Sequence, residues 1–403
     1  MSNIKINRNS IRLSLLVIFT FSMPNSVTLN DISLISIVIF WLFYDDKKSI
    51  IEIVKTNKIA QLSLLYFISN IFALLWTENI ARGLEMILKE KEFLLLPIFM
   101  SLIKDNEKEL LIKTFLTSMF ISEAISYSVK FEIIAPIFKA TVYEPIPFIS
   151  HIHYSPYAAF TSYILMYFVL FREDRSKIEK AIALFFWLTI SINLFMTGGR
   201  AGQVVYFILV IILLFQYFKL SIKTFLLAII LLPSIFIIAY NTSTIFKNRV
   251  DITIHNLNNY EQHKSTSIGL RITTWKNSIE IIKEHPLLGV GGGDYIDEYK
   301  KMNMKNSPNE SILWQPHNMY LTSYLFTGLF GFIIFLILLI ALLYYAINIH
   351  DRYRPMREAF ILYYIVIMFS ESYLLNHNGK IMFMIFISIL FNKLRSSSEN
   401  CDS

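Results

Sequence analysis

Long apolar stretches separated by short polar segments extend along almost the whole chain. One of them, residues 317–347, has a histidine at its start and no charged residue after it. A hydrocarbon core ~30 Å thick needs ~20 apolar residues per helix, and a helix satisfies its own backbone hydrogen bonds within lipid. The pattern predicts an all-α polytopic membrane protein with about 12 transmembrane helices, at roughly residues 11–23, 31–44, 60–76, 84–103, 110–129, 155–171, 181–197, 201–218, 222–240, 317–347, 358–375 and 379–392.

The polar residues divide the chain into three parts. Residues 1–240 contain the first nine predicted spans, residues 241–316 form one large loop, and residues 317–403 contain the last three spans and a polar tail. Within the loop, apolar residues recur at spacings of three, four and three, which predicts an amphipathic helix that lies on the membrane or covers a cavity. These residues are Ile272, Trp275, Ile279 and Ile282.

Composition and charge add an orientation to this picture. Hydrophobic residues make up 55% of the chain and charged residues 17%, which is more apolar than a soluble domain can bury in one core. Lys and Arg gather in the loops on the side of the N-terminus, so the positive-inside rule predicts both ends in the cytoplasm and the 241–316 loop outside. The net charge of +7 reflects this excess, and no nucleic-acid partner is needed to explain it. Cys401 is the only cysteine, which excludes a disulfide framework and a thiolate zinc site.

Two arginines and a histidine are expected together at the outer face. Arg200 follows two glycines at the start of the eighth span, and Arg271 lies in the first turn of the amphipathic helix. Each can contact lipid or solvent, but a guanidinium at a helix N-terminus also favours a bound phosphate or diphosphate. His317 is expected to begin the tenth span, either as a headgroup contact or as a general base. Two permanent cations and a proton acceptor suit attack of a hydroxyl on a carbon bonded to a diphosphate.

Other polar residues give less specific expectations. His151 and His153 alternate as in an extended segment, and either line a sugar site or bind a metal, for which no third ligand is evident. Lys89 and Lys91 alternate with two glutamates in the outer part of the fourth span, where they either pair with these acids or face a cavity. Lys380, in a short outer turn with a neighbouring histidine, is expected to be solvated. The glycine cluster at residues 289–293 lacks the Lys-Ser/Thr ending of a phosphate loop and predicts a flexible turn or hinge.

At these residues the chain resembles the O-antigen ligase and polymerase superfamily, and in particular the lipid A-core:surface polymer ligases. The resemblance rests on TGGRAG, on RITTWKNSIEIIKEHPLLGVGGGDY and on PHNMYLTSYLFTGLFG. In the last segment His317, Asn318, Gly328 and Gly331 match the ligase pattern H-N-x9-G-x2-G.

The resemblance implies that a large periplasmic loop forms part of a cavity above the bacterial inner membrane. It further implies that Arg200 and Arg271 bind the diphosphate of an undecaprenyl-diphosphate-linked glycan donor, and that His317 activates the acceptor hydroxyl. Transfer is then inverting and metal-independent, with no cofactor and no nucleotide sugar. Asn318, His153, Lys89 and Lys91 are further candidates for binding substrate.

We therefore expect an O-antigen ligase that transfers the lipid-linked polysaccharide to a sugar hydroxyl of lipid A-core in lipopolysaccharide biosynthesis. The main alternative is an O-antigen polymerase, which shares the donor but extends a lipid-linked chain. Protein O-oligosaccharyltransferases usually have additional C-terminal sequence. A flippase or transporter would place ionisable residues along an interior path, often with repeat symmetry, whereas the charges here gather at span ends.

Overall fold

The computed structural model describes residues 7–44 and 47–394. Within these ranges the chain folds into α-helices and short 3-10 turns, without a β-strand. The all-α prediction is therefore confirmed. Cys401 and the rest of the polar tail lie outside the described residues.

Seven helices in the described part of the chain are long and apolar enough to cross a membrane. They are α2 (Val27–Tyr44), α4 (Lys58–Phe72) with its extension η1 (Ala73–Leu75), α7 (Lys108–Lys130) preceded by η2 (Asp105–Glu107), α9 (Lys177–Phe195), α10 (Arg200–Phe218), α11 (Ile222–Thr242) and α15 (Met319–Asn348). A chain with this many apolar helices has the architecture of a multi-pass membrane protein.

The number of about 12 spans is not confirmed. Helices lie at the remaining predicted positions, but none in the described residues meets the same length and apolarity. They are α1 (Arg8–Ser22), α8 (His151–Leu170), α16 (Arg354–Ile367) and α17 (His377–Phe391). The predicted fourth span is two helices, α5 (Ile80–Lys89) and α6 (Lys91–Leu102), because the backbone leaves helical geometry at Glu90.

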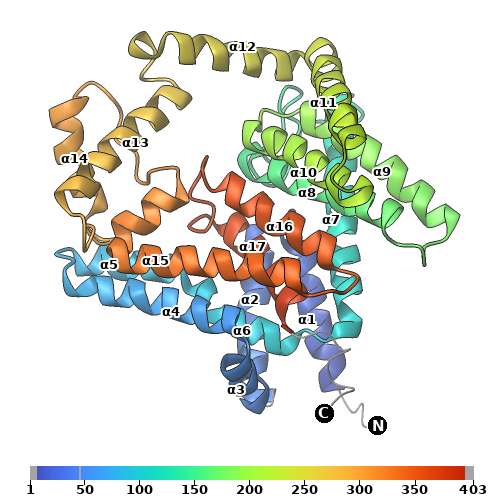
Figure 1. Cartoon of the computed structure of the whole chain (residues 1–403), viewed down its shortest axis with the longest axis horizontal. Helices are drawn as coiled ribbons and strands as arrows, with labels where there is room; N and C mark the ends of the chain where they lie inside the picture. Colours follow the sequence, from blue (N-terminus) through green and yellow to red (C-terminus); the bar gives the residue numbers. More distant parts are fainter. Residues whose placement is uncertain (1–6, 45–46, 395–403) are drawn as a thin grey trace.

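The 241–316 segment folds into three further helices, α12 (Thr244–Asn258), α13 (Ser267–Glu284) and α14 (Tyr295–Asn306), with a short η3 (Tyr260–Gln262). In Figure 1 they lie at the end of the molecule opposite to α3 (Lys47–Thr56). The predicted amphipathic stripe is on α13. Its buried side is formed by other residues, including Thr274 and Asn277, whereas Ile279 of the stripe is 44% exposed. The other three residues of the stripe are partly buried, and Ile282 packs against a buried apolar cluster, so only part of the stripe is exposed.

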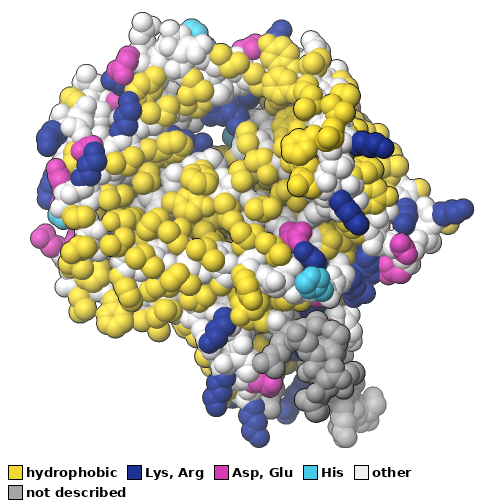
Figure 2. All heavy atoms as spheres, viewed as in Figure 1, with side chains coloured by type: hydrophobic (Ala, Val, Ile, Leu, Met, Phe, Trp, Pro, Cys, Tyr) yellow, Lys and Arg dark blue, Asp and Glu magenta, His cyan; other side chains and the backbone are white. Residues whose placement is uncertain are grey.

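A broad apolar surface covers the face of the molecule that includes α4 and α15 (Figure 2). On α15, large exposed side chains recur every three or four residues, from Phe330 at 67% exposure through Ile333 and Ile337 to Ile340. An apolar surface this wide is rare on soluble monomers. We infer that it faces the acyl chains of the bilayer.

The outer segment packs on α15 through a small buried apolar cluster, which includes Ile281, Tyr295, Met302 and Phe326. The packing is close enough to need glycine. Gly328 has a φ of 68°, and a Cβ on it would lie 2.4 Å from the carbonyl oxygen of Leu287. The predicted turn at residues 289–293 is present, but its glycines are packed, since a Cβ on Gly293 would lie 2.3 Å from the Asn79 carbonyl oxygen. The turn is therefore a tight connection between elements, which differs from the free hinge that was expected.

Candidate functional site

Arg200 is the first residue of α10, as the sequence predicts. Helices α8 and α10 approach so closely here that a Cβ on Gly199 would lie 1.9 Å from the Ser155 hydroxyl. The TGGRAG glycines therefore let the two backbones meet and place Arg200 at the helix start. Its guanidinium donates hydrogen bonds to Thr253 Oγ1 on α12 and to Ser267 Oγ on α13, both at 3.2 Å. Within the described residues it forms no ion pair with a carboxylate, so its charge is available to an anion.

His317 does not begin the tenth span, which corrects the sequence prediction. Helix α15 starts at Met319, and the side chain of Asn318 caps it by accepting hydrogen bonds from Tyr320 N and Leu321 N at 3.0 and 3.1 Å. The other side-chain group of Asn318 donates to the Phe369 carbonyl. Asn318 is therefore used by the fold, and its side chain is not free to hold a substrate.

The backbone of His317 is in the left-handed region, with a φ of 51°. This conformation is uncommon for a residue with a side chain and persists only where the surroundings enforce it. Trp275 Nε1 donates to the Pro316 carbonyl at 3.0 Å, and Met319 N donates to the Met368 carbonyl at 2.8 Å. The residues on both sides of His317 are thus held, and its ring has a defined direction.

A buried carboxylate, Glu371, lies at the centre of the site. It belongs to the loop between α16 and α17, and its side chain is 4% exposed. One carboxylate oxygen is 2.6 Å from His317 Nδ1 and 3.3 Å from the Arg271 guanidinium, and the other accepts a hydrogen bond from Gln315 Nε2 at 2.7 Å. The structure therefore joins two of the three predicted residues, Arg271 and His317, through a residue that sequence analysis did not single out.

Glu371 is ionised at neutral pH. Burial opposes ionisation, but the hydrogen bond and electrostatic interaction with His317 and the charge of Arg271 outweigh it, and together they hold the pKa of Glu371 below its ordinary value. A carboxylate at Nδ1 selects the tautomer in which Nδ1 carries the hydrogen. The Nε2 atom of His317 is then the one that can accept a proton.

A third arginine joins the site. Arg200 lies within electrostatic range of both Arg271 and Arg249 of α12. The Arg249 guanidinium is beside Gly198, where a Cβ would approach its Nη2 atom to 2.7 Å. The positive charge here therefore comes from three elements, α10, α12 and α13, which meet only in the folded chain.

His151 and His153 lie in the first turn of α8, so the expected extended segment is wrong. His151 Nδ1 is 3.5 Å from Glu144, whose carboxylate also accepts hydrogen bonds from Gly198 N. The ring of His153 meets the edge of Tyr373, and its Nδ1 is buried without a hydrogen-bond partner in the described residues. Both histidines thus border the loops that hold the site, and no group of three metal-binding side chains occurs in the described part of the chain.

The charges around Lys89 are mostly paired. Lys89 Nζ is 3.4 Å from Glu85 and lies over the Trp314 ring, while Lys91 is 4.0 Å from Glu92. Lys380 was expected to be solvated, but it is 7% exposed, lies 3.1 Å from Glu92 and donates to the Lys89 carbonyl at 2.7 Å. Lys380 is buried because the helix break at residue 90 places Glu90 and Glu92 in the interior. A buried cation beside these two acids is favourable.

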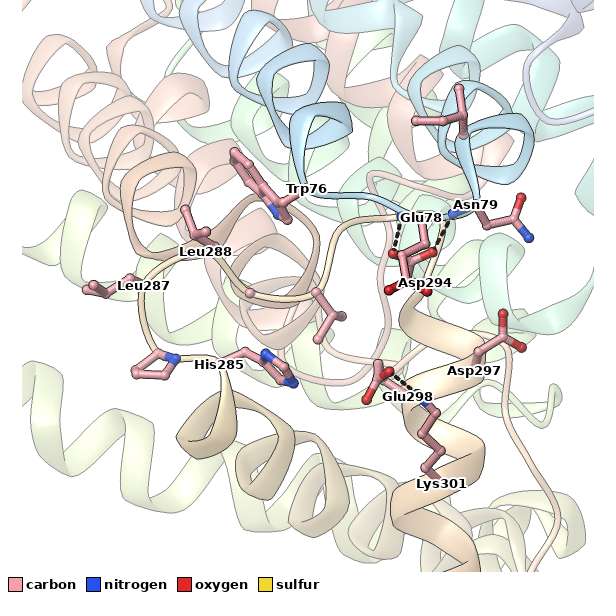
Figure 3. A pocket seen from close by; sticks show the side chains of 14 residues that line it. Trp76, Glu78, Asn79, His285, Leu287, Leu288, Asp294, Asp297, Glu298 and Lys301 are labelled. Carbon is pink, nitrogen blue, oxygen red and sulfur yellow. Dashed lines mark hydrogen bonds and ion pairs between the residues drawn. The ribbon is translucent and has the colours of Figure 1, made fainter.

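A separate cleft of about 810 Å³ lies between the η1–α5 turn and the α13–α14 connection. Figure 3 shows Trp76, Asn79 and His285 around it, together with four acidic side chains, Glu78, Asp294, Asp297 and Glu298. Asp294 closes one wall by accepting hydrogen bonds from the backbone of residues 78 and 79. None of the three predicted site residues lines this cleft. An acidic lining of this kind disfavours an anionic ligand, whereas the arginines lie near His317.

Comparison with known proteins bears on this geometry. A protein of Haemophilus influenzae that is described as uncharacterized is 25% identical to the chain over 240 residues, which is 56% of this chain and 59% of that protein. The chain therefore spans about 59% of the length of this relative. The family model described as O-antigen ligase matches residues 183–336, which contain Arg200, Arg249, Arg271 and His317. The part of the chain that holds the arginines and the histidine is therefore similar to the O-antigen ligase family over these residues.

Proposed function

We propose that the chain is an O-antigen ligase that transfers an undecaprenyl-diphosphate-linked polysaccharide to a sugar hydroxyl of lipid A-core. The observation that supports the chemistry best is the buried chain of contacts from Arg271 through Glu371 to His317. It supplies a proton acceptor with a selected tautomer beside uncompensated positive charge. The family match supports a ligase or a polymerase in general, and the choice of the ligase follows the H-N-x9-G-x2-G spacing.

In the proposed reaction, His317 Nε2 takes the proton of the acceptor hydroxyl while the hydroxyl oxygen attacks the anomeric carbon of the donor glycan. The bond between that carbon and the diphosphate oxygen breaks, and the lipid diphosphate leaves with the electron pair. A single displacement inverts the anomeric configuration. Glu371 stabilises the imidazolium through Nδ1, in the way that a buried carboxylate orients and stabilises a catalytic histidine.

The three arginines have an electrostatic role in the proposed reaction. Arg200, Arg249 and Arg271 would stabilise the charge that develops on the leaving diphosphate, because guanidinium groups match phosphate oxygens in a bidentate manner. Loss of one preorganised donor typically costs ~2.7–4 kcal/mol of transition-state stabilisation. The reaction is proposed to need no metal, because these side chains supply the positive charge.

The polymerase alternative differs in its acceptor and gives a different product. Deleting the coding sequence in its native host and analysing lipopolysaccharide by gel electrophoresis separates the two. Bare core with accumulated carrier-linked polymer supports the ligase, whereas core with a single repeat supports the polymerase. Unchanged lipopolysaccharide would contradict both. Complementation with His317→Ala should fail, and His350→Ala, an exposed histidine in the loop after α15, is the matched control.

The location is also part of the proposal. We place the reacting groups at the periplasmic face of the bacterial inner membrane, with both chain ends in the cytoplasm. The position of α12–α14 opposite to the lysine-rich α3 supports this orientation (Figure 1). Both proposed substrates, the glycan donor and lipid A-core, are anchored in lipid. This explains why His317, the proposed base, lies just before the long apolar helix α15.

A further inference from the structure

A second site lies at the other end of the membrane helices. An apolar groove of about 420 Å³ runs between α7, α8 and α9, which contact one another. Its walls are Leu116, Phe120, Leu165, Phe168, Ile182 and Phe186. The groove is near the start of α9, whereas Arg200 follows the end of that helix. A helix of 19 residues is about 28 Å long at ~1.5 Å per residue, so the groove and the His317 region are on opposite sides of the membrane.

The mouth of the groove has more cations than nearby carboxylates can neutralise. Four cationic side chains lie within ion-pair distance of the single carboxylate Glu109; they are Lys113, Arg172, Arg175 and Arg352. Lys180 lines the groove as well and forms no ion pair within residues 7–44 and 47–394. Glu179 and Asp174 add two carboxylates to this group. The mouth therefore has a net positive charge at the level where α8 ends and α9 begins.

Arg175 also has an unused donor. Its side chain lines the groove and is only 9% exposed, and its Nε is buried without an acceptor in the described part of the chain. The Nη1 atom of Arg172, which shares Glu109 with it, is in the same situation. Buried N–H groups are almost always hydrogen-bonded. Of these two donors, Arg175 Nε belongs to a side chain that lines the groove, where Lys113 and Lys180 add positive charge that favours an anionic ligand.

We propose that this groove binds an anionic glycerophospholipid, with an acyl chain along the apolar walls and the phosphate at Lys113, Arg175 and Lys180. The apolar depth favours a lipid over a free anion, because the walls continue from the charged mouth to Phe120 and Phe186 within the helices. Net positive charge favours phosphatidylglycerol over phosphatidylethanolamine, since the ammonium group of the latter would face the same cations. The lipid would brace the helix pair α8–α9 on the side of the membrane opposite to the arginines.

The test uses the full chain, purified in detergent and stripped of lipid. Native mass spectrometry counts bound phosphatidylglycerol and phosphatidylethanolamine of matched acyl chains, and thermal unfolding measures the stabilisation by each. We expect retained phosphatidylglycerol and a higher Tm with it, and weaker effects of phosphatidylethanolamine. The variant K113Q/K180Q should bind phosphatidylglycerol about 10- to 30-fold more weakly, from ~1 kcal/mol per lysine near a lipid surface.

Two further variants separate the shape of the groove from the charge at its mouth. Thr117 is exposed and lines the groove, so Thr117→Phe should fill it and reduce binding without a change in charge. The control K219Q/K223Q removes two exposed lysines, one after α10 and one in the first turn of α11, outside the groove, and should bind as the unmodified chain does. Three outcomes would overturn the assignment. They are equal binding of both phospholipids, an equal loss of binding in the control and the groove variant, and a preference for a polyprenyl phosphate.

Discussion

Glu371 determines what His317 can do in this structure. His317 stands out in the sequence because it begins a long apolar stretch. Glu371 lies 54 residues later, and no sequence pattern connects the two residues. The sequence offered one indication of Glu371, which is an acid near the end of the predicted span 358–375. Acids are rare within membrane segments. At the scale of single residues, sequence analysis therefore found His317, the base that we propose, and missed the carboxylate that contacts it.

The first prediction concerns this pair. Replacing Glu371 with Gln keeps a side chain of the same shape, but it removes the charge that stabilises the imidazolium and selects the tautomer. We expect transfer to fall by roughly 10²- to 10⁴-fold, as is typical when a general base loses its support. The measurement is the rate of glycan transfer in reconstituted vesicles. Glu173→Gln in the α8–α9 loop is the control, and a comparable loss there would remove the specific role of Glu371.

The lowered pKa of Glu371 also predicts a pH dependence of stability. A group whose pKa is lower in the folded state stabilises the fold above its unfolded pKa, near 4.5, and this contribution is lost as the pH falls through the folded value. Below about pH 5, the difference in Tm between the unmodified chain and Glu371→Gln should shrink as the pH falls further. A difference that grows below about pH 5 would contradict the assigned direction.

Arg249 is a second residue that sequence analysis missed, because it lies in a polar stretch with no periodic pattern. If it contributes to the charge that meets the diphosphate, Arg249→Ala should reduce transfer by about 10- to 100-fold, in line with ~1.5–3 kcal/mol for a hydrogen bond to a charged group. Lys247→Ala, an exposed cation on the same helix, should have little effect. Equal losses of transfer in the two variants would indicate that α12 contributes only its overall positive charge, without a specific contact from Arg249.

At the scale of elements, the fold explains why the motifs contain glycine. Gly202 of TGGRAG faces the backbone of α8, where a Cβ would lie 2.1 Å from the carbonyl carbon of Ser155. Gly328 combines a positive φ with close backbone contact, and Gly331 meets Thr327 and Ser69. The sequence indicated the positions of these glycines, but only the structure identified the partner at each one.

Gly328 gives a prediction at this scale. A side chain here is strained by the φ of 68° and by the Leu287 carbonyl, so Gly328→Ala should destabilise the chain by more than ~1 kcal/mol. It should also displace the 285–291 connection from α15. Gly83→Ala is the control, because its Cβ would mainly meet the movable end of Leu74. Thermal unfolding in detergent compares the two, and equal Tm values would contradict the expected strain.

At the scale of the whole molecule, the long segment 241–316 and the lysine-rich α3 occupy opposite ends. The charge count of the loops predicts that these two parts lie on opposite sides of the membrane. Reporter fusions test the assignment. A periplasm-active phosphatase fused after Asn259 should be active, and the same enzyme fused after Glu173 should be inactive. Activity of only the second fusion would invert the orientation and place the arginines in the cytosol.

The sequence alone determined that the chain is α-helical and rich in membrane helices, because apolar length and backbone hydrogen bonding in lipid leave few other solutions. It also indicated Arg200, Arg271 and His317, since each lies at a boundary between an apolar and a polar segment. Only the tertiary structure decided that Glu371 joins two of them, that Asn318 caps a helix, that Lys380 is buried and that the fourth span is broken. These features depend on which distant segments become neighbours, and polar groups withdrawn from water must find partners wherever the packing places them.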